Sequence, residues 1–236
     1  DVSVKYVDVA GGAVLNDMLL GNNLEFATGG LPPFLILWSK AAGTPNEVKA
    51  IAAVGGTPST LYTRDPDVKS IKDLSSRDKI AVAGVKSSQV AIVLQMAAAE
   101  AFGGKDYAKL DPLTVTMRDA DAVGVLKSGK GELTGHFTYD PYRAAYENDP
   151  AIHPILQSKD VLGGAGTVTV AYATVRFHEA NPKTVAAYLA ALSEADDIIK
   201  RDPARAARDF KTLAKAAQSD AELTATFGVS RPVLRE

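Results

Sequence analysis

The stretch IAVAGVKSSQVAIVLQ, residues 80–95, carries the pattern that decides the fold class. Its first residues form a short apolar run typical of a buried strand, and Gly84 with Ser87 and Ser88 is typical of a tight turn. The apolar residues that follow have helical spacing, and the predicted helix ends before Gly103. The stretch therefore predicts one strand–turn–helix unit, which is the building block of an α/β sheet.

The same alternation continues along the chain. Runs of β-branched and apolar residues between turn residues predict strands over 2–9, 24–30, 47–54, 59–66, 79–84, 113–118, 132–141, 153–158 and 166–177. Helical spacing, with Pro near several starts and Gly near several ends, predicts helices over 13–20, 32–43, 88–102, 120–128, 182–201, 203–217 and 220–227. This order predicts an α/β protein with mostly parallel sheets, and it places Trp38, well inside a predicted helix, in the core.

Two parts of the chain repeat the same order of elements. LLGNNLEFATGGLPP (19–33) aligns with KSGKGELTGHFTYDP (127–141) at an offset of 108 residues, and the predicted strand and helix before each of them also match. The repeat predicts two similar lobes. In the second lobe this unit follows strand 79–84 and helix 88–102, whose counterparts would fall before residue 1. We therefore expect the first lobe to lack its first strand and helix in this chain.

Composition excludes several classes of protein. The chain has 236 residues, is 46% hydrophobic and has a net charge of −2, so it lacks the basic excess typical of nucleic-acid-binding proteins. No apolar run reaches the length of a membrane-spanning helix. The chain has no cysteine, which excludes disulfides, cysteine-ligated metals and thiol nucleophiles. No spacing typical of metal ligands and no nucleophile with a base stands out, so we expect no metal, no cofactor and no catalysis.

The predicted ligand site lies at the ends of the strands. Ligands of open α/β sheets bind beyond the carboxyl ends of the strands, and in a two-lobed protein the default site is the cleft between the lobes. The loops at these positions supply the candidate ligand-binding residues, which are Thr28, Gly29, Gly30, Thr57, Ser59, Lys86, Ser87, Ser88, Gln89, Arg118, Asp119, His136, Phe137, Tyr139 and Asp140. The turn at 84–89 lacks the glycine spacing of a Walker loop, and no GxGxxG motif is present, so nucleotide binding is disfavoured.

Two interpretations stay open for these candidates. Ser87 and Ser88 can bind an anion together with the free amides of a helix start, or one of them can simply cap the helix. Arg118 can clamp a carboxylate or sulfonate, or it can form a surface ion pair. The aromatic and acidic candidates between residues 136 and 140 can contact a ligand, or they can serve the core and a turn.

Four stretches together resemble a known family. They are LLGNNLEFATGGLPP (19–33), DPDVKSIKDLSSRDKIAVAGVKSSQVAIVLQMAA (65–98), LKSGKGELTGHFTYDPY (126–142) and GTVTVAYATVRFHEANPKTVAAYLAAL (166–192). Their order and spacing are similar to those of the solute-binding proteins of ABC importers of the nitrate/sulfonate/taurine type. Glu25-Phe26 stands where the family has Asp-Phe, and His136-Phe137 stands where many members have Trp, so the identity of the ligand does not carry over.

The resemblance implies a two-lobed periplasmic-binding-protein fold of the second type, in which the chain crosses twice between the lobes. Lobe one would contain residues 1–57 and 167–236, and lobe two residues 58–166. Members of the family begin with a strand and a helix ahead of the matched region, in agreement with the repeat. The resemblance also favours Ser87 and Ser88 as ligand-facing groups.

The function implied is that of a periplasmic receptor that closes around a small anionic or organic solute, such as a sulfonate, taurine or nitrate. Its partners would be that solute and an ABC permease in the inner membrane, and it would be an exported monomer whose signal peptide is not in this sequence. An alternative on the same fold is a thiamine-pyrimidine-synthase-like enzyme or a pyrimidine-binding relative. That enzyme uses a cysteine-rich motif, which this chain lacks. A ligand-sensing regulator is disfavoured because no helix-turn-helix pattern is visible.

Overall fold

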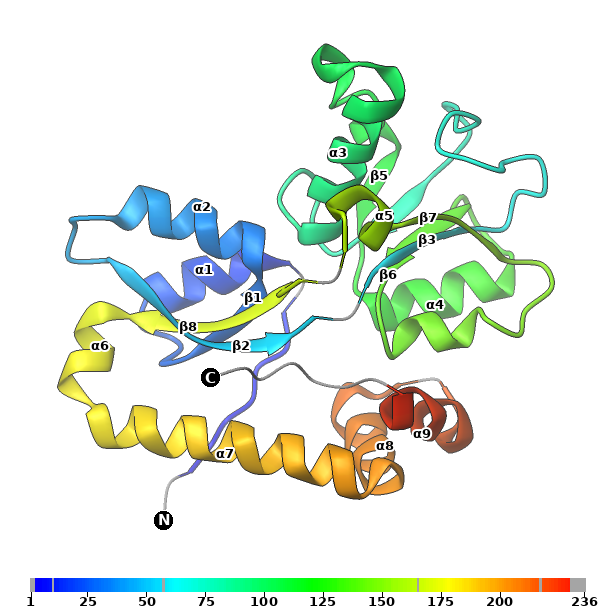
Figure 1. The fold of residues 1–236 in the computed structure, drawn as a ribbon. Helices are drawn as coiled ribbons and strands as arrows, with labels where there is room; N and C mark the ends of the chain where they lie inside the picture. The colour runs from blue at the N-terminus through cyan, green and yellow to red at the C-terminus, as the bar shows by residue number, and fades with distance from the viewer. Residues whose placement is uncertain (1–2, 10, 57, 165, 217, 230–236) are drawn as a thin grey trace.

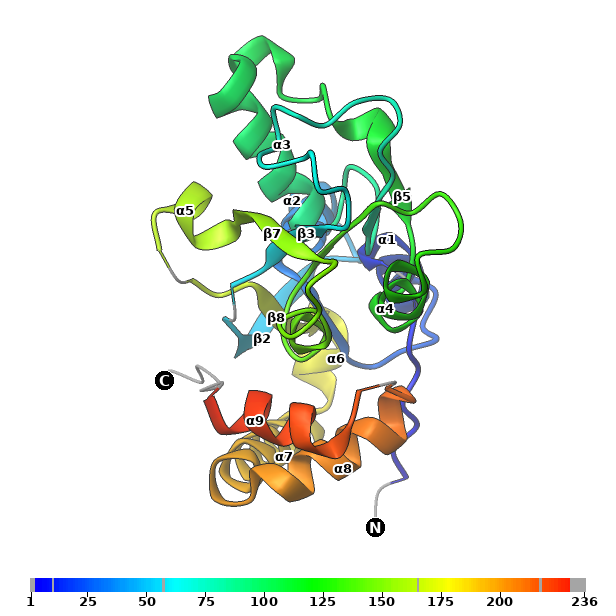
Figure 2. The same cartoon turned by 90° about the vertical axis from the view of Figure 1, so that its right-hand side faces the viewer.

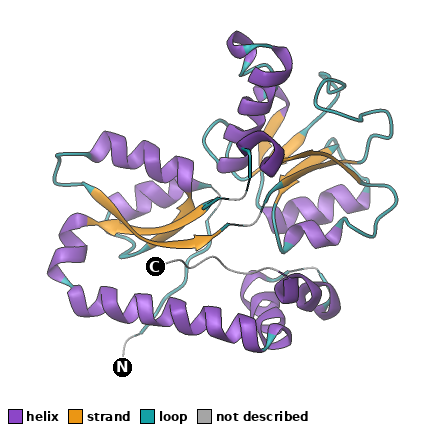
Figure 3. Cartoon of the chain, in the orientation of Figure 1, coloured by secondary structure: helices purple, strands orange, loops and turns teal. Residues whose placement is uncertain are grey.

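The computed structural model describes residues 3–9, 11–56, 58–164, 166–216 and 218–229, and it shows two lobes side by side (Figure 1). Each lobe has its own β-sheet with helices packed against it, as the secondary-structure colouring in Figure 3 makes plain. The view in Figure 2, turned by 90°, shows the C-terminal helices gathered at one end of the molecule. The expected two-lobed α/β architecture is therefore confirmed.

Lobe one is built on a sheet of three strands in the order β1-β8-β2. Strand β8 (Thr169–Thr174) lies in the centre and runs antiparallel to both β1 (Ala27–Gly30) and β2 (Val48–Gly55). Helices α1 (Gly12–Leu20) and α2 (Leu31–Ala41) cover one face, and α7 (Pro182–Arg201) runs along the other (Figure 1). Leucines and aromatic rings from α1, α2 and β8 form the core between the two helices and the sheet.

Lobe two is built on a sheet of five strands in the order β5-β4-β6-β3-β7. The strands are β3 (Thr60–Thr63), β4 (Ile80–Val82), β5 (Thr114–Thr116), β6 (Gly135–Thr138) and β7 (His153–Gln157). Helix α3 (Gln89–Phe102) packs on one face with Leu61 and Ile80, and α4 (Asp119–Ser128) packs on the other with Tyr62 and Ala81. Because successive residues of a strand point to opposite faces, a strand covered on both sides is apolar throughout, as the run at 80–82 is.

The chain crosses between the two sheets twice. It leaves lobe one after β2 and enters lobe two at β3, and it returns after β7 and the short helix α5 (Ser158–Leu162) to β8. From β8 it continues through α6 (Val175–Ala180) and α7 to α8 (Pro203–Ala214) and α9 (Asp220–Val229), which lie below lobe two in Figure 1. Short 3-10 turns lie at Gly104–Asp106, Asp111–Leu113 and Tyr142–Ala145.

The internal repeat is confirmed at the level of secondary structure. At the offset of 108 residues, the ends of β1, Ala27 and Gly30, fall on the ends of β6, Gly135 and Thr138. The same offset places α1 within one residue of α4. The two lobes therefore reuse one helix–strand unit, and lobe two serves as a template for lobe one.

The predicted strand over 2–9 is wrong for the residues that the structure describes, because 3–9 has no strand assignment. The repeat gives the reason. The counterpart of this segment is β5, which pairs with β4 alone, and β4 in turn pairs with β6. Among the described residues no strand occupies the matching place between 3–9 and β1, so the segment finds no ladder partner. Val4 and Tyr6 are accordingly 86% and 75% exposed.

Three further expectations need correction. The sheets are not mostly parallel, since only the pairs β4–β5 and β4–β6 are parallel among the described strands. The strand predicted over 166–177 is shorter because α6 begins at Val175, where the Thr174 hydroxyl accepts a hydrogen bond from the Phe177 amide at 3.2 Å. Trp38 is not in the core but 49% exposed, because the buried stripe of α2 passes through Phe34 and Leu37.

Candidate functional site

The start of helix α3 forms one side of the candidate site. The amides of Ser87 and Ser88 both donate to the carbonyl of Gly84, at 3.4 and 3.0 Å, which closes the tight turn expected after strand β4. Lys86 has a φ of +61°, in the left-handed region that a non-glycine residue rarely adopts. Turns of this kind point successive amides to one side and form concavities that bind anions.

The two serines of this turn divide their roles. Ser88 is buried and caps the helix, because its hydroxyl accepts a hydrogen bond from the Ala91 amide at 3.4 Å. Ser87 is half-buried and lines a hollow beside α1 and α2. The amides of Gln89 and Val90, in the first turn of α3, meet no hydrogen-bond acceptor in the part of the chain that the structure describes.

The start of helix α1 lies directly against this turn. Gly11 has a φ of +77°, and a Cβ placed on it would come 2.6 Å from the carbonyl oxygen of Ala83, at the end of β4. Only glycine allows such a close approach of the two backbones. No side chain caps α1, and within the described residues no hydrogen bond reaches the amides of Gly12 and Ala13. Two helix N-termini, one from each lobe, therefore face the same place.

The end of strand β1, from Thr28 to Gly30, also reaches the other lobe, and the polar groups described around it are already paired. A Cβ on Gly30 would lie 3.6 Å from the Cβ of Gln89, so this strand end meets the start of α3. The first amide of α2, on Leu31, donates to the carbonyl of Val168 at 2.9 Å, and the next two residues are prolines without an N–H. The hydroxyl of Thr28 lies 3.1 Å from that of Tyr188 on α7 and is engaged there.

The first turn of helix α4 carries the carboxylate of Asp119, which is already paired with neighbouring side chains. One oxygen of Asp119 accepts from the Thr138 hydroxyl at 2.6 Å and lies 3.1 Å from Nε2 of His136. The other ring nitrogen of His136 lies 2.7 Å from the hydroxyl of Tyr146, and the ring is only 1% exposed. A carboxylate in the first turn already compensates the helix dipole, so this N-terminus is not a place for a further anion. His136 is a buried structural residue.

Arg118 forms an ion pair with Asp8, which comes from the segment before α1. Both side chains are about half exposed, at 47% and 48%. This pair brings the N-terminal segment of lobe one against the start of α4 in lobe two. Of the two interpretations of Arg118, the structure shows the ion pair.

The aromatic candidates in and after β6 have different surroundings. Phe137 is fully buried in the core beneath α3. Tyr139 and Tyr142 form an edge-to-face pair with ring centres 6.4 Å apart. The Asp119 carboxylate and burial raise the pKa of Tyr139 well above its usual value, and burial, with Asp119 second, raises the pKa of Tyr142 to about 12. Both phenols are therefore neutral donors at physiological pH.

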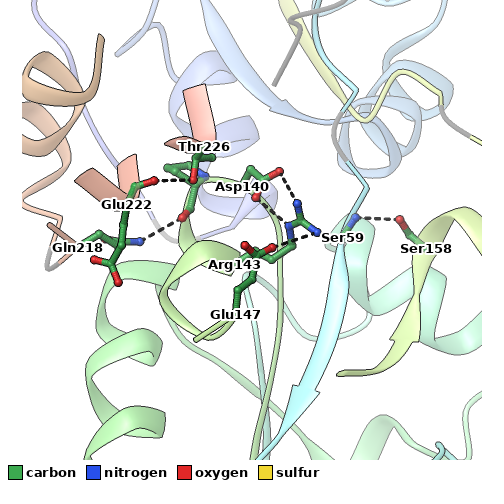
Figure 4. A network of polar contacts seen from close by, with 9 residues as sticks. Ser59, Asp140, Arg143, Glu147, Ser158, Gln218, Glu222 and Thr226 are labelled. Carbon is green, nitrogen blue, oxygen red and sulfur yellow. Dashed lines mark hydrogen bonds and ion pairs between the residues drawn. The ribbon is translucent and has the colours of Figure 1, made fainter. Parts of the chain in front are cut away.

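Asp140 has a structural partner, and Ser59 is held through its backbone, whereas its buried hydroxyl has no hydrogen-bond partner among the described residues (Figure 4). Asp140 forms a two-point ion pair with Arg143, with Nε–Oδ1 and Nη2–Oδ2 distances of 2.8 and 3.2 Å, as expected for a turn residue. Ser59 is 1% exposed at the first crossover, where its amide donates to the hydroxyl of Ser158 at 2.8 Å. Thr57, the neighbouring candidate, lies outside the described residues.

A hollow of about 440 Å³ lies between α1 and α2 and ends at Ser87. Its lining is mostly apolar, with side chains such as Ile36 and Leu37, and it includes the polar side chains of Asn16, Asp17 and Lys40. Sequence reasoning missed this hollow and the roles of Gly11 and Gly12. The available signal was the glycine pair immediately before an apolar helical run, which is typical of a helix start that a second backbone approaches closely.

Solved structures of solute-binding proteins share this arrangement of lobes. The alkanesulfonate-binding protein SsuA from Xanthomonas axonopodis pv. citri, bound to MOPS, matches with a TM-score of 0.73 at 19% identity, over 97% of this chain and 74% of that one. The periplasmic aliphatic sulphonate binding protein SsuA from Escherichia coli gives 0.69 at 17% identity, over 97% and 74% of the two chains. The chain has a periplasmic-binding-protein fold.

A third structure of this periplasmic-binding-protein fold is the nitrate-binding protein NrtA from Synechocystis PCC 6803, with a TM-score of 0.65 at 15% identity, over 97% and 64% of the chains. The sulfonate- and nitrate-binding proteins are the class that the sequence motifs resemble, and that resemblance is confirmed at the level of the fold. No family model and no curated protein matches the sequence. The chain spans about three quarters of the two sulfonate-binding structures.

No described helix is long and apolar enough to cross a membrane. Across the same residues, no group of three or more histidine and acidic side chains is placed to hold a metal ion. The polar groups that the fold brings to the starts of α1 and α3 are backbone amides and the Ser87 hydroxyl.

Proposed function

We propose that this protein is the periplasmic solute-binding component of an ABC importer, which holds a small anionic solute between its lobes and delivers it to a membrane permease. The likeness to sulfonate- and nitrate-binding structures supports the class of function. The observation that carries the proposal is the meeting of the α1 and α3 N-termini, one from each lobe, at Gly11 and Ala83.

The electrostatics of the four helix starts favour this one place for an anion. Free amides and the positive ends of two helix dipoles attract negative charge at the starts of α1 and α3. At the start of α2 the Leu31 amide is already paired and the next two residues are prolines, and the start of α4 carries Asp119 and Asp121. Lys86 adds a cation, and Ser87 adds a hydroxyl that can donate to the ligand. We assign the anionic group of the solute to this junction.

The two crossovers support a hinge mechanism. A hinge absorbs the change in backbone angles in a few connecting residues, and the lobes move as rigid bodies around the ligand. Residues 56–59 and 163–168 connect the sheets here. The contacts of Gly11 with Ala83 and of Gly30 with Gln89 mean that the lobes touch across the site, which corresponds to a closed arrangement.

We further propose that the sheet of lobe one takes an additional strand–helix unit between segment 3–9 and β1. In lobe two the matching place is filled by β4 and α3. If the proposal is right, the backbone amides of residues 4–8 in the 236-residue chain exchange with deuterium within seconds. Strong protection of these amides would show that the sheet is already complete.

The function is tested by thermal unfolding with alkanesulfonates, taurine, nitrate, aromatic acids and pyrimidines. A ligand present at a hundred times its dissociation constant stabilises the folded state by about 2.7 kcal/mol. Lys86→Ala and Ser87→Ala should reduce the shift, whereas Lys69→Ala and Ser76→Ala, at surface positions of the same lobe, should leave it unchanged. Absence of any shift with all of these compounds would refute the receptor, and turnover of one of them would favour the enzyme alternative.

A further inference from the structure

The C-terminal helices α8 and α9 form a hairpin with a small core of its own. Ala207, Ala216 and Leu223 are buried between the two helices, and the rings of Phe210 and Phe227 pack edge to face at 5.7 Å. Lys211 and Asp220 close the hairpin with an ion pair of 2.7 Å. The hairpin is therefore a compact unit, joined to α7 at Asp202, whose carboxylate caps α8.

This hairpin reaches lobe two, although the chain enters it from lobe one. The side chain of Gln218 is buried, and its Nε2 donates to the carbonyl of Pro141 at 3.3 Å (Figure 4). The ring of Phe210 lies edge to face on Tyr142, with the ring centres 5.9 Å apart. At its other end, α7 is fixed to lobe one, where Tyr188 stacks on Phe26 with ring centres 4.2 Å apart.

The residues that the hairpin contacts belong to the loop after β6, at the boundary between the lobes. Tyr142 packs against Tyr139 in this loop, and the Asp8 and Asp119 carboxylates are close enough to raise the pKa of Tyr142. The loop thus lies between the N-terminal segment of lobe one and the hairpin. A rotation of lobe two about the crossovers moves this loop, so the loop must either carry the hairpin along or break the contacts of Gln218 and Phe210.

We propose that the α8–α9 hairpin is a third link between the lobes, and that Gln218 and Phe210 position the Tyr139–Tyr142 loop and hold the lobes together. The two covalent crossovers allow rotation, and the hairpin resists it through contacts that include the buried Gln218 hydrogen bond and the Phe210–Tyr142 ring contact. This inference uses the two-lobed hinge of the proposed function, but it does not depend on the identity of the solute.

The test measures the distance between the lobes without any ligand. The chain has no cysteine, so spin labels at Ser39→Cys on α2 and Lys105→Cys beyond α3 are the only labels in the molecule. Double electron–electron resonance between the two spin labels then gives the distribution of inter-lobe distances. Gln218→Ala removes the hydrogen bond, and Tyr142→Ala removes the aromatic contact from the side of lobe two while Phe210 and Phe227 stay in place.

We expect each variant to raise the ratio of open to closed molecules by roughly fivefold, the effect of losing one contact of this size. Tyr142→Phe keeps the ring on Phe210 and should restore the distribution of the parent. Leu213→Ala, at a position 71% exposed on α8, is the control and should change nothing. Circular dichroism identifies any variant that has lost its helices. If Tyr142→Ala does not fold, the inter-lobe distances of the folded Gln218→Ala protein alone decide the test.

Unchanged distances in folded Gln218→Ala and Tyr142→Ala proteins would overturn the proposal. This result would leave the receptor function intact, because ligand-induced stabilisation is measured separately. Conversely, a chain that binds none of the tested solutes can still show the shift in distances. The two proposals therefore fail independently.

Discussion

Ser59 and Ser158 tie the two crossovers together by a reciprocal pair of hydrogen bonds. The Ser59 amide donates to the Ser158 hydroxyl at 2.8 Å, and the Ser158 amide donates to the Ser59 carbonyl at 2.8 Å. Both residues are at most 2% exposed. Ser59 ends the first crossover, just before β3, and Ser158 begins the second crossover, just after β7. Their contact therefore fixes the two crossovers relative to each other.

Ser158→Ala should destabilise the protein by about 1–2 kcal/mol, because the buried amide of Ser59 loses its acceptor. Urea unfolding followed by circular dichroism measures the change. Ser76→Ala, at an exposed position of the same lobe, serves as the control and should stay within about 0.5 kcal/mol of the parent. Equal unfolding midpoints for the two variants would show that the contact contributes nothing.

Gly11→Ala should open the contact between the lobes. Ala at this position suffers from the positive φ and from the carbonyl of Ala83, which a Cβ would approach to 2.6 Å. Gly43 has nearly the same φ, +72°, and a Cβ placed on it would meet nothing within 4 Å. Gly43→Ala therefore carries the backbone strain alone, about 1 kcal/mol.

The comparison of these two variants isolates the steric contact between α1 and β4. We expect Gly11→Ala to cost roughly 1–3 kcal/mol more than Gly43→Ala, or to shift the inter-lobe distance instead. A protein that tolerates both substitutions equally, with the same distance distribution, would contradict the close approach of α1 to the end of β4.

Asp119→Ala should be strongly destabilising. The substitution leaves the Thr138 hydroxyl and Nε2 of His136 without their common acceptor in a buried place, which costs roughly 2–3 kcal/mol. Asp121→Ala removes a carboxylate from the same first turn of α4, where the side chain is exposed, so it loses only the interaction with the helix dipole. Similar unfolding free energies for both variants would exclude the network as a source of stability.

Asp8 and Arg118 should contribute little to stability in spite of their ion pair. Both side chains are about half exposed, and exposed pairs contribute at most about 1 kcal/mol. A double-mutant cycle with Asp8→Ala and Arg118→Ala, measured at low and at high salt, gives the coupling. We expect it to be small and to decrease with salt, and a coupling that resists salt would indicate a desolvated pair.

Tyr142 should make the protein lose stability above pH 10. Its pKa is raised to about 12 by burial first and by Asp119 second, so the folded protein holds this proton more tightly than the unfolded chain does. The stabilisation is complete below pH 10 and is lost as the pH rises from 10 to 12. Tyr142→Phe should reduce the loss, which urea midpoints at pH 9 and pH 11 measure. The same slope in both proteins would contradict the raised pKa.

Local patterns predicted most elements of this fold. Strand β4 and helix α3 follow from the apolar run at 80–82 and from the Ser88 cap, and α7 begins and ends at the expected residues, 182 and 201. The repeat at an offset of 108 residues predicted that β1 and β6 are equivalent. The helices and strands themselves depend on contacts within a few residues, and helix caps, prolines and apolar spacing encode such contacts directly.

Pairing partners decided the rest. A β-branched stretch such as 3–9 becomes a strand only when a neighbour supplies hydrogen bonds, and the sequence of the stretch says nothing about that neighbour. The same holds for side chains at the site. The sequence predicts His136 as a ligand contact at the end of a strand. In the structure its two ring nitrogens contact Asp119 and Tyr146, which are 17 and 10 residues away, so the side chain is buried and structural.

The sequence by itself determined the α/β class, the two-lobed repeat and the serine cap of α3, because residue patterns along the chain encode each of these directly. Only the tertiary structure decided which helix starts meet. In the folded chain the N-termini of α1 and α3 meet, and the Asp119 carboxylate takes up the polar groups near the N-terminus of α4. The first amide of α2 is paired with Val168, and the C-terminal hairpin packs against Tyr142. The physical reason is that an anion site and a hinge both depend on distances between segments far apart in the chain, and chain packing alone sets those distances.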